Sequence, residues 1–64
     1  MPKLNEPVIV IANLHGRTPF MGERGVFVGY TNYGEYKIDL DRYGKYPFHP
    51  REVALIEQEG IKLV

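Results

Sequence analysis

The chain has 64 residues and a mass of 7.4 kDa, a size that fits one small domain and excludes multidomain enzymes, eight-unit βα barrels and dinucleotide-binding folds. Eight basic and eight acidic side chains give a formal net charge of zero, which argues against a protein that coats nucleic acid with positive charge. Cysteine is absent, so disulfides, thiolate metal sites and cysteine nucleophiles are excluded.

Glycine and proline divide the chain into short segments that are rich in β-branched and aromatic residues, which is typical of strands. Residues 8–12 predict a first strand, and residues 13–22 predict a long loop. Residues 24–30 predict a second strand, in which Gly25 and Gly29 indicate a bulge, a bend or a close backbone approach.

The third strand has the clearest pattern in the chain. It follows a tight turn at residues 31–34, and residues 35–41 then alternate between apolar and charged side chains. The alternation predicts that Tyr36, Ile38 and Leu40 face the interior and that the residues between them face the solvent.

The next segments are shorter. Residues 42–45 predict a turn, and residues 46–48 predict an edge strand, because Pro47 has no amide hydrogen to donate. Residues 49–52 predict one turn of 3₁₀ helix, and residues 53–56 predict the last core strand.

Two alternatives remain open near the C-terminus. Residues 61–64 predict either a sixth short strand or a packed tail. Residues 50–58 contain several good helix formers, so an α-helix there is the rival to a 3₁₀ turn followed by a strand.

This order of elements resembles that of the SH3-like small barrels. Residues 22–30 resemble the Gly-x-x-Gly-x-Val segment that enters the second strand of KOW-type barrels, and residues 36–40 resemble their third strand. Residues 48–53 resemble their Phe-x-x-x-Glu-Val step into the last strand, and the resemblance covers residues 7–56.

The resemblance implies an all-β fold, an SH3-like small barrel of five to six short strands with one 3₁₀ turn before the last core strand. Residues 1–6 are then an N-terminal extension, and residues 7–64 form a single barrel. The family includes KOW domains of ribosomal and transcription proteins, Tudor-like readers, subunits of larger complexes and small phage proteins. It implies function by contact rather than by catalysis.

Aromatic residues are the first candidates for a contact surface, because the chain has five tyrosines and three phenylalanines and no tryptophan. Tyr33 and Tyr43 lie on predicted turns and Tyr46 begins the predicted edge strand, so none has an obvious core position. The alternative is that these rings only cover the ends and edges of the barrel. The candidate partner-binding set, including the first loop, is His15, Arg17, Phe20, Tyr33, Tyr43 and Tyr46.

Basic residues are the second group of candidates, because basic groups beside aromatic rings are typical of phosphate contact and base stacking. Glu52, Glu57 and Glu59 follow closely in the sequence, so a mixed surface that suits a protein partner or only solvent is the alternative. The candidate nucleic-acid set is Arg17, Arg24, Arg42, Lys45 and Arg51.

No pattern points to catalysis or to a metal. Asp39 and Asp41 lie on the same face of a predicted strand, where a solvent-facing exterior is a better account than a cation site. His15 and His49 could share a metal ion, but two histidines without cysteine are few ligands for a metal site. We therefore expect neither enzymatic activity nor a cofactor.

The prediction is a non-enzymatic interaction module that binds a larger protein as a small subunit, adaptor or inhibitor. The alternative is a KOW-like module that binds nucleic acid or the ribosome. Self-association through the edge segments 46–48 and 61–64 is a third possibility. The first residues lack the apolar stretch of a secretory signal and no apolar run spans a membrane, so we expect a cytoplasmic protein.

Overall fold

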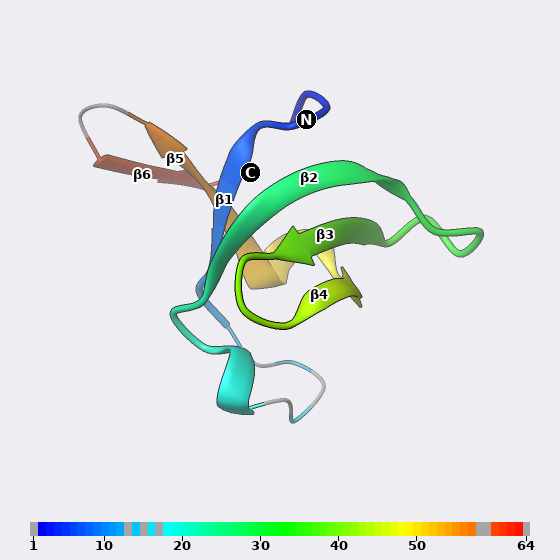
Figure 1. The fold of residues 1–64 in the computed structure, drawn as a ribbon, viewed down its shortest axis with the longest axis horizontal. Coiled ribbons are helices and arrows are strands. Elements are labelled where there is room, and N and C mark those ends of the chain that lie inside the picture. The colour runs from blue at the N-terminus through cyan, green and yellow to red at the C-terminus, as the bar shows by residue number, and fades with distance from the viewer. Residues whose placement is uncertain (1, 13, 15, 17, 58–59, 64) are drawn as a thin grey trace.

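The protein folds as one antiparallel β-sheet, as seen in a computed structural model that describes residues 2–12, 14, 16, 18–57 and 60–63 (Figure 1). Within these residues the strands are β1 (Pro7–Val10), β2 (Arg24–Tyr30), β3 (Tyr36–Leu40), β4 (Gly44–Phe48), β5 (Val53–Glu57) and β6 (Gly60–Leu63). Two 3₁₀ turns precede β2 and β5, and these are η1 (Thr18–Phe20) and η2 (Pro50–Glu52).

The order of strands across the sheet is β4-β3-β2-β1-β5-β6, so β4 and β6 form its two edges. The predictions of an all-β fold and of a 3₁₀ turn before the last core strand are confirmed. Over the residues that the structure describes, no ladder joins β4 to β6, so the hydrogen-bonded sheet is open rather than closed.

The rival prediction of a helix over residues 50–58 is wrong, because Val53–Glu57 is a strand. Its register pairs Val10 with Val53 and Val8 with Leu55. This ladder to β1 supplies the backbone hydrogen bonds and the burial that override the helix propensity of the segment.

The core lies on one face of the curved sheet. The alternation predicted for β3 is confirmed, because Tyr36, Ile38 and Leu40 are buried whereas Lys37 is exposed and Asp39 is half-buried. The buried apolar residues that pack together are Val8, Val10, Phe27, Tyr36, Ile38, Leu40, Phe48 and Val53.

The two glycines of β2 have the roles that the sequence indicated. A Cβ on Gly25 would lie 2.8 Å from the Leu40 Cα and would also meet the Asp39 carbonyl oxygen, so this position requires the close approach of two backbones. Gly29 has a φ of 136°, and the register with β3 shifts between Phe27 and Gly29, as in a β-bulge.

Several strand bounds differ from the sequence prediction, and the first strand is Pro7–Val10 rather than residues 8–12. β4 begins at Gly44, which pairs with Leu40, although residues 42–45 were expected to form a turn. The described part of the predicted extension 1–6 is tied to β2, because the Asn5 amide donates to the Phe27 carbonyl at 2.7 Å and the Glu6 carbonyl accepts from the Phe27 amide at 3.0 Å.

Candidate functional site

The end of the first loop pairs with the last residue of β1 and brings Phe20 to the sheet. The Gly22 amide donates to the Val10 carbonyl, and the Val10 amide donates to the Glu23 carbonyl, each at 2.9 Å. The Glu23 amide also donates to the Phe20 carbonyl at 3.0 Å, which closes the turn that follows η1. These bonds fix the end of the loop on the C-terminal side of the Phe20 ring.

Phe20 lies between two tyrosine rings and forms with them an aromatic cluster, defined as Phe20, Tyr43 and Tyr46. Its ring centroid is 5.1 Å from that of Tyr43 and 4.7 Å from that of Tyr46, both within the range of favourable aromatic pairs. The buried Phe48 ring lies 6.0 Å from Phe20 and connects the cluster to the core.

Much of the aromatic cluster remains in contact with solvent. Tyr43 is 42% exposed, Tyr46 is 38% exposed and the adjacent Met21 is 44% exposed. The Arg42 guanidinium lies 5.7 Å from the centre of the Tyr43 ring and 3.5 Å from a carboxylate oxygen of Glu23. The cluster therefore combines apolar surface with tyrosine hydroxyls and a cation, a combination enriched in protein interfaces.

Tyr33 does not join the aromatic cluster. It is 91% exposed on the turn between β2 and β3, where its amide donates to the Thr31 hydroxyl at 3.2 Å. Tyr43 follows β3 at the opposite end of that strand, and a five-residue strand spans about 16 Å. His15 and Arg17, the other members of the candidate partner-binding set, lie outside the described residues.

Glu52 is a structural residue that sequence reasoning missed, since it was read as a surface acid. It is only 1% exposed, and its carboxylate accepts the His49 amide at 2.7 Å and the Leu14 amide at 3.1 Å. The Glu52 carbonyl also accepts from the Ile11 and Ala12 amides, so the residue ties η2 to the first loop. The signal was present in the sequence, because a Pro at the first helical position with Glu two residues later is typical of a capping box.

A second group of rings lies near the β2–β3 turn. Phe27, Tyr30 and Tyr36 contact one another at centroid distances of 5.2, 5.3 and 5.7 Å. Burial, and to a smaller extent the neighbouring Tyr30, raises the pKa of the Tyr36 hydroxyl above its ordinary value of 10.0. This group is part of the core and its edge.

The candidate nucleic-acid residues are distributed over the fold. Arg24 begins β2, Arg42 lies in the turn after β3, Lys45 lies on β4 and Arg51 lies in η2. Arg42 is already paired with Glu23, and Arg17 lies outside the described residues.

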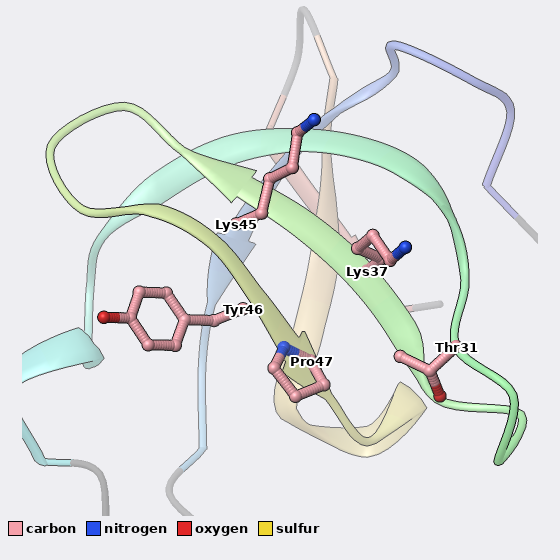
Figure 2. Close-up of a pocket in the computed structure, with 5 residues that line it drawn as sticks. All are labelled: Thr31, Lys37, Lys45, Tyr46 and Pro47. Atoms are coloured by element: carbon pink, nitrogen blue, oxygen red, sulfur yellow. The ribbon is translucent and has the colours of Figure 1, made fainter.

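A shallow groove of about 200 Å³ crosses the edge of the sheet formed by β3 and β4 (Figure 2). It is lined by Thr31, Lys37, Lys45, Tyr46 and Pro47. Figure 2 shows the ammonium groups of both lysines on one side of β4 and the Tyr46 ring on the other, directed toward the first loop. Tyr46 therefore belongs to both the groove and the aromatic cluster.

The described residues contain no cluster of three or more histidine or carboxylate side chains that could hold a metal ion. His49 accepts the Arg51 amide at its Nδ1 at 3.1 Å, so this nitrogen caps η2. Asp39 and Asp41 lie on the half-buried and exposed exterior of the sheet. Among the residues that the structure describes, no helix has the length and apolar character needed to cross a bilayer.

No protein-family model matches the chain, and comparison with curated proteins finds no similar sequence.

Proposed function

We propose that this protein is a non-enzymatic interaction module that binds a protein partner through the aromatic cluster of Phe20, Tyr43 and Tyr46. The observation that supports this proposal is the exposure of two tyrosine rings in contact with a third ring that is joined to the core. Anchored aromatic rings provide large contact area at low cost in side-chain entropy, which is typical of energetically dominant interface residues.

The exposure of the cluster argues for binding rather than for stability alone. A ring that keeps about 40% of its surface in water gains only part of the burial free energy available to it, at about 25 cal/mol per Å² of apolar surface. A partner that covers Tyr43, Tyr46 and Met21 would bury the surface that remains exposed and so gain the rest of this free energy. The surrounding hydroxyls and the Arg42 guanidinium would supply the polar rim of such an interface.

We also propose that the sheet belongs to an SH3-like small barrel. Three features support this: the run β4-β3-β2-β1-β5, the long connection between β1 and β2, and the 3₁₀ turn η2 between β4 and β5. In such a barrel the interior is filled by side chains, so the outer surface and the loops carry the function.

The test compares two matched tyrosine variants. Tyr43→Ser removes a ring of the aromatic cluster, and Tyr33→Ser removes a more exposed ring at the other end of β3. A protein captured on the immobilised chain is purified, and its affinity is measured for the wild type and both variants by calorimetry. We expect Tyr43→Ser to weaken the complex about 30-fold or more, the loss of about 2 kcal/mol that defines a dominant interface residue. Tyr33→Ser is expected to leave the affinity unchanged.

Equal affinities of the wild type and Tyr43→Ser would contradict the proposal, as would a loss caused by unfolding of the variant, which circular dichroism detects. A complex formed with RNA or DNA, with an affinity that falls linearly with the logarithm of salt concentration, would instead support the KOW-like alternative. Sedimentation of the chain alone at several concentrations separates both outcomes from self-association.

A further inference from the structure

The two edges of the open sheet differ in their free main-chain groups. The Asp41 amide donates to the Arg24 carbonyl at 2.9 Å, so every second residue before Asp41 on β3 also directs its main-chain groups toward β2. The residues of β4 opposite these, Lys45 and Pro47, therefore direct their own groups to the free edge. Proline has no amide hydrogen, and proline and lysine on an edge both hinder pairing with a further strand.

The direction of the main-chain groups on β6 follows from the ladder between β1 and β5. The Ile11 amide donates to the Glu52 carbonyl at 2.7 Å. Because the direction alternates from one residue to the next in an antiparallel ladder, Leu55 turns its amide and carbonyl away from β1 and toward β6. The ladder partner of Leu55 on β6 is Lys62, whose main-chain groups point back at β5.

The neighbours of Lys62 on β6 direct their main-chain groups to the free edge. Ile61 and Leu63 each have one amide donor and one carbonyl acceptor there, and within the described residues no strand pairs with this side of β6. Figure 1 shows β6 well away from β4, as expected for opposite edges of the sheet. An edge that has free donors and acceptors and no proline is a template for another strand.

We infer that two copies of this chain associate through their β6 edges, as an antiparallel pair of strands related by a two-fold axis at Lys62. In this register, Ile61 of each copy lies opposite Leu63 of the other, and the free donors and acceptors of both edges are all paired. A register centred on Ile61 or Leu63 pairs fewer of these groups within β6. This complementarity of the edge with itself favours a second copy over a strand of another protein.

The same register brings two lysines together. Lys62 of one copy lies directly opposite Lys62 of the other, in the type of pair whose Cα atoms are only about 4.5 Å apart. Like charges opposite each other destabilise a ladder. Added salt screens this repulsion and is expected to tighten the dimer. The sign of this salt dependence is opposite to that of a nucleic-acid complex.

The inference goes beyond the proposed function and uses a different edge of the sheet. Tyr46 of the aromatic cluster lies on β4, whereas the two copies pair at β6. The dimer carries two aromatic clusters, so a partner with two docking segments binds it more tightly than the monomer, because the second contact is intramolecular. Tyr43→Ser is expected to weaken the partner complex and to leave the dimer unchanged, so the two proposals fail separately.

The test is sedimentation of the 64-residue chain at concentrations up to about 1 mM, because a short edge-to-edge contact is smaller than a standard interface. Ile61→Pro removes the outward amide hydrogen without removing a bond to β5, as Pro47 does on β4. Ile61→Ala keeps the amide hydrogen and is the matched control. We expect Ile61→Pro to dimerise about tenfold or more weakly than Ile61→Ala, with both variants folded by circular dichroism.

Hydrogen exchange locates the contact. The Ile61 and Leu63 amides are expected to become protected as the concentration of the chain rises, whereas the outward Lys45 amide on β4 exchanges at an unchanged rate. Mixing the wild type with Lys62→Glu replaces two like charges by an opposite pair, so this heterodimer is expected to be about fivefold tighter than the wild-type dimer. Lys45→Glu is the control and is expected to give no such gain.

A chain that stays monomeric up to about 1 mM would overturn the inference, as would equal dimerisation of Ile61→Pro and Ile61→Ala. Concentration-dependent protection of the Lys45 amide would place the contact at β4 and would also overturn it. Protection of Ile61 and Leu63 only after addition of the purified partner would overturn it in favour of a strand of that partner.

Discussion

Replacing Glu52 by glutamine is expected to destabilise the fold by about 2–4 kcal/mol. The carboxylate is 1% exposed and accepts two backbone amides, those of His49 at 2.7 Å and Leu14 at 3.1 Å. A hydrogen bond to a charged group contributes about 1.5–3 kcal/mol, and the loss is larger where a buried donor is left without a partner, which gives the expected range of about 2–4 kcal/mol. Glutamine keeps one acceptor oxygen but turns an NH₂ group toward the second amide, so one bond is lost and two donors face each other.

This loss is large for a chain of 64 residues, whose total stability is about 3–10 kcal/mol. Urea unfolding followed by circular dichroism measures it, and with a slope of about 1 kcal/mol per M the midpoint falls by about 2 M or more. Because Leu14 belongs to the first loop, hydrogen exchange at its amide is expected to quicken as well.

Glu6→Gln is the matched control for Glu52→Gln. The Glu6 carboxylate also accepts one backbone amide, that of Lys3 at 2.9 Å, but this bond is exposed to water. The expected change is within about 0.5 kcal/mol. If Glu52→Gln and Glu6→Gln destabilise the fold equally, the account of Glu52 as the residue that joins η2 to the first loop is wrong.

Two further substitutions test the fold. Gly25→Ala places a Cβ 2.8 Å from the Leu40 Cα and against the Asp39 carbonyl oxygen. We expect the unfolding free energy measured in urea to fall by about 1–3 kcal/mol or more. Unchanged stability would refute the close approach of the two backbones. For Tyr36, a raised folded-state pKa means that the folded protein holds the hydroxyl proton more tightly than the unfolded chain. The free energy of unfolding therefore falls as the pH rises above about 10, and Tyr36→Phe is expected to lessen this fall. If the unfolding free energies of the wild type and Tyr36→Phe fall in parallel as the pH rises, the raised pKa is contradicted.

Much of the sheet followed from local sequence patterns. The bounds of β2 and the inward face of β3 were predicted because apolar alternation has the period of a strand and a buried face fixes its register. Gly44 was assigned to a turn because glycine is a turn signal, but pairing with Leu40 extends β4 to include it. The helix rival near Pro50 failed because β1 was available as a pairing partner, which no local propensity records.

The candidate site was only partly predictable. Phe20, Tyr43 and Tyr46 were each identified, and the structure brings them together where the end of the first loop pairs with Val10 of β1. Tyr33 was grouped with them, although it lies on the turn before β3 and Tyr43 lies on the turn after it, so the two are at opposite ends of that strand. Glu52 was read as a surface charge because carboxylates are rarely buried, and its burial depends on amides supplied from a distant part of the chain.

The most direct test of the proposed binding surface is the aromatic NMR spectrum of the chain with and without its purified partner. Tyr43 and Tyr46 are expected to show the largest changes in their ring resonances on binding, while Tyr33, at the other end of β3, keeps its free-state signals. Changes confined to Tyr33, or unchanged rings throughout the aromatic cluster when the complex is saturated, would contradict the account.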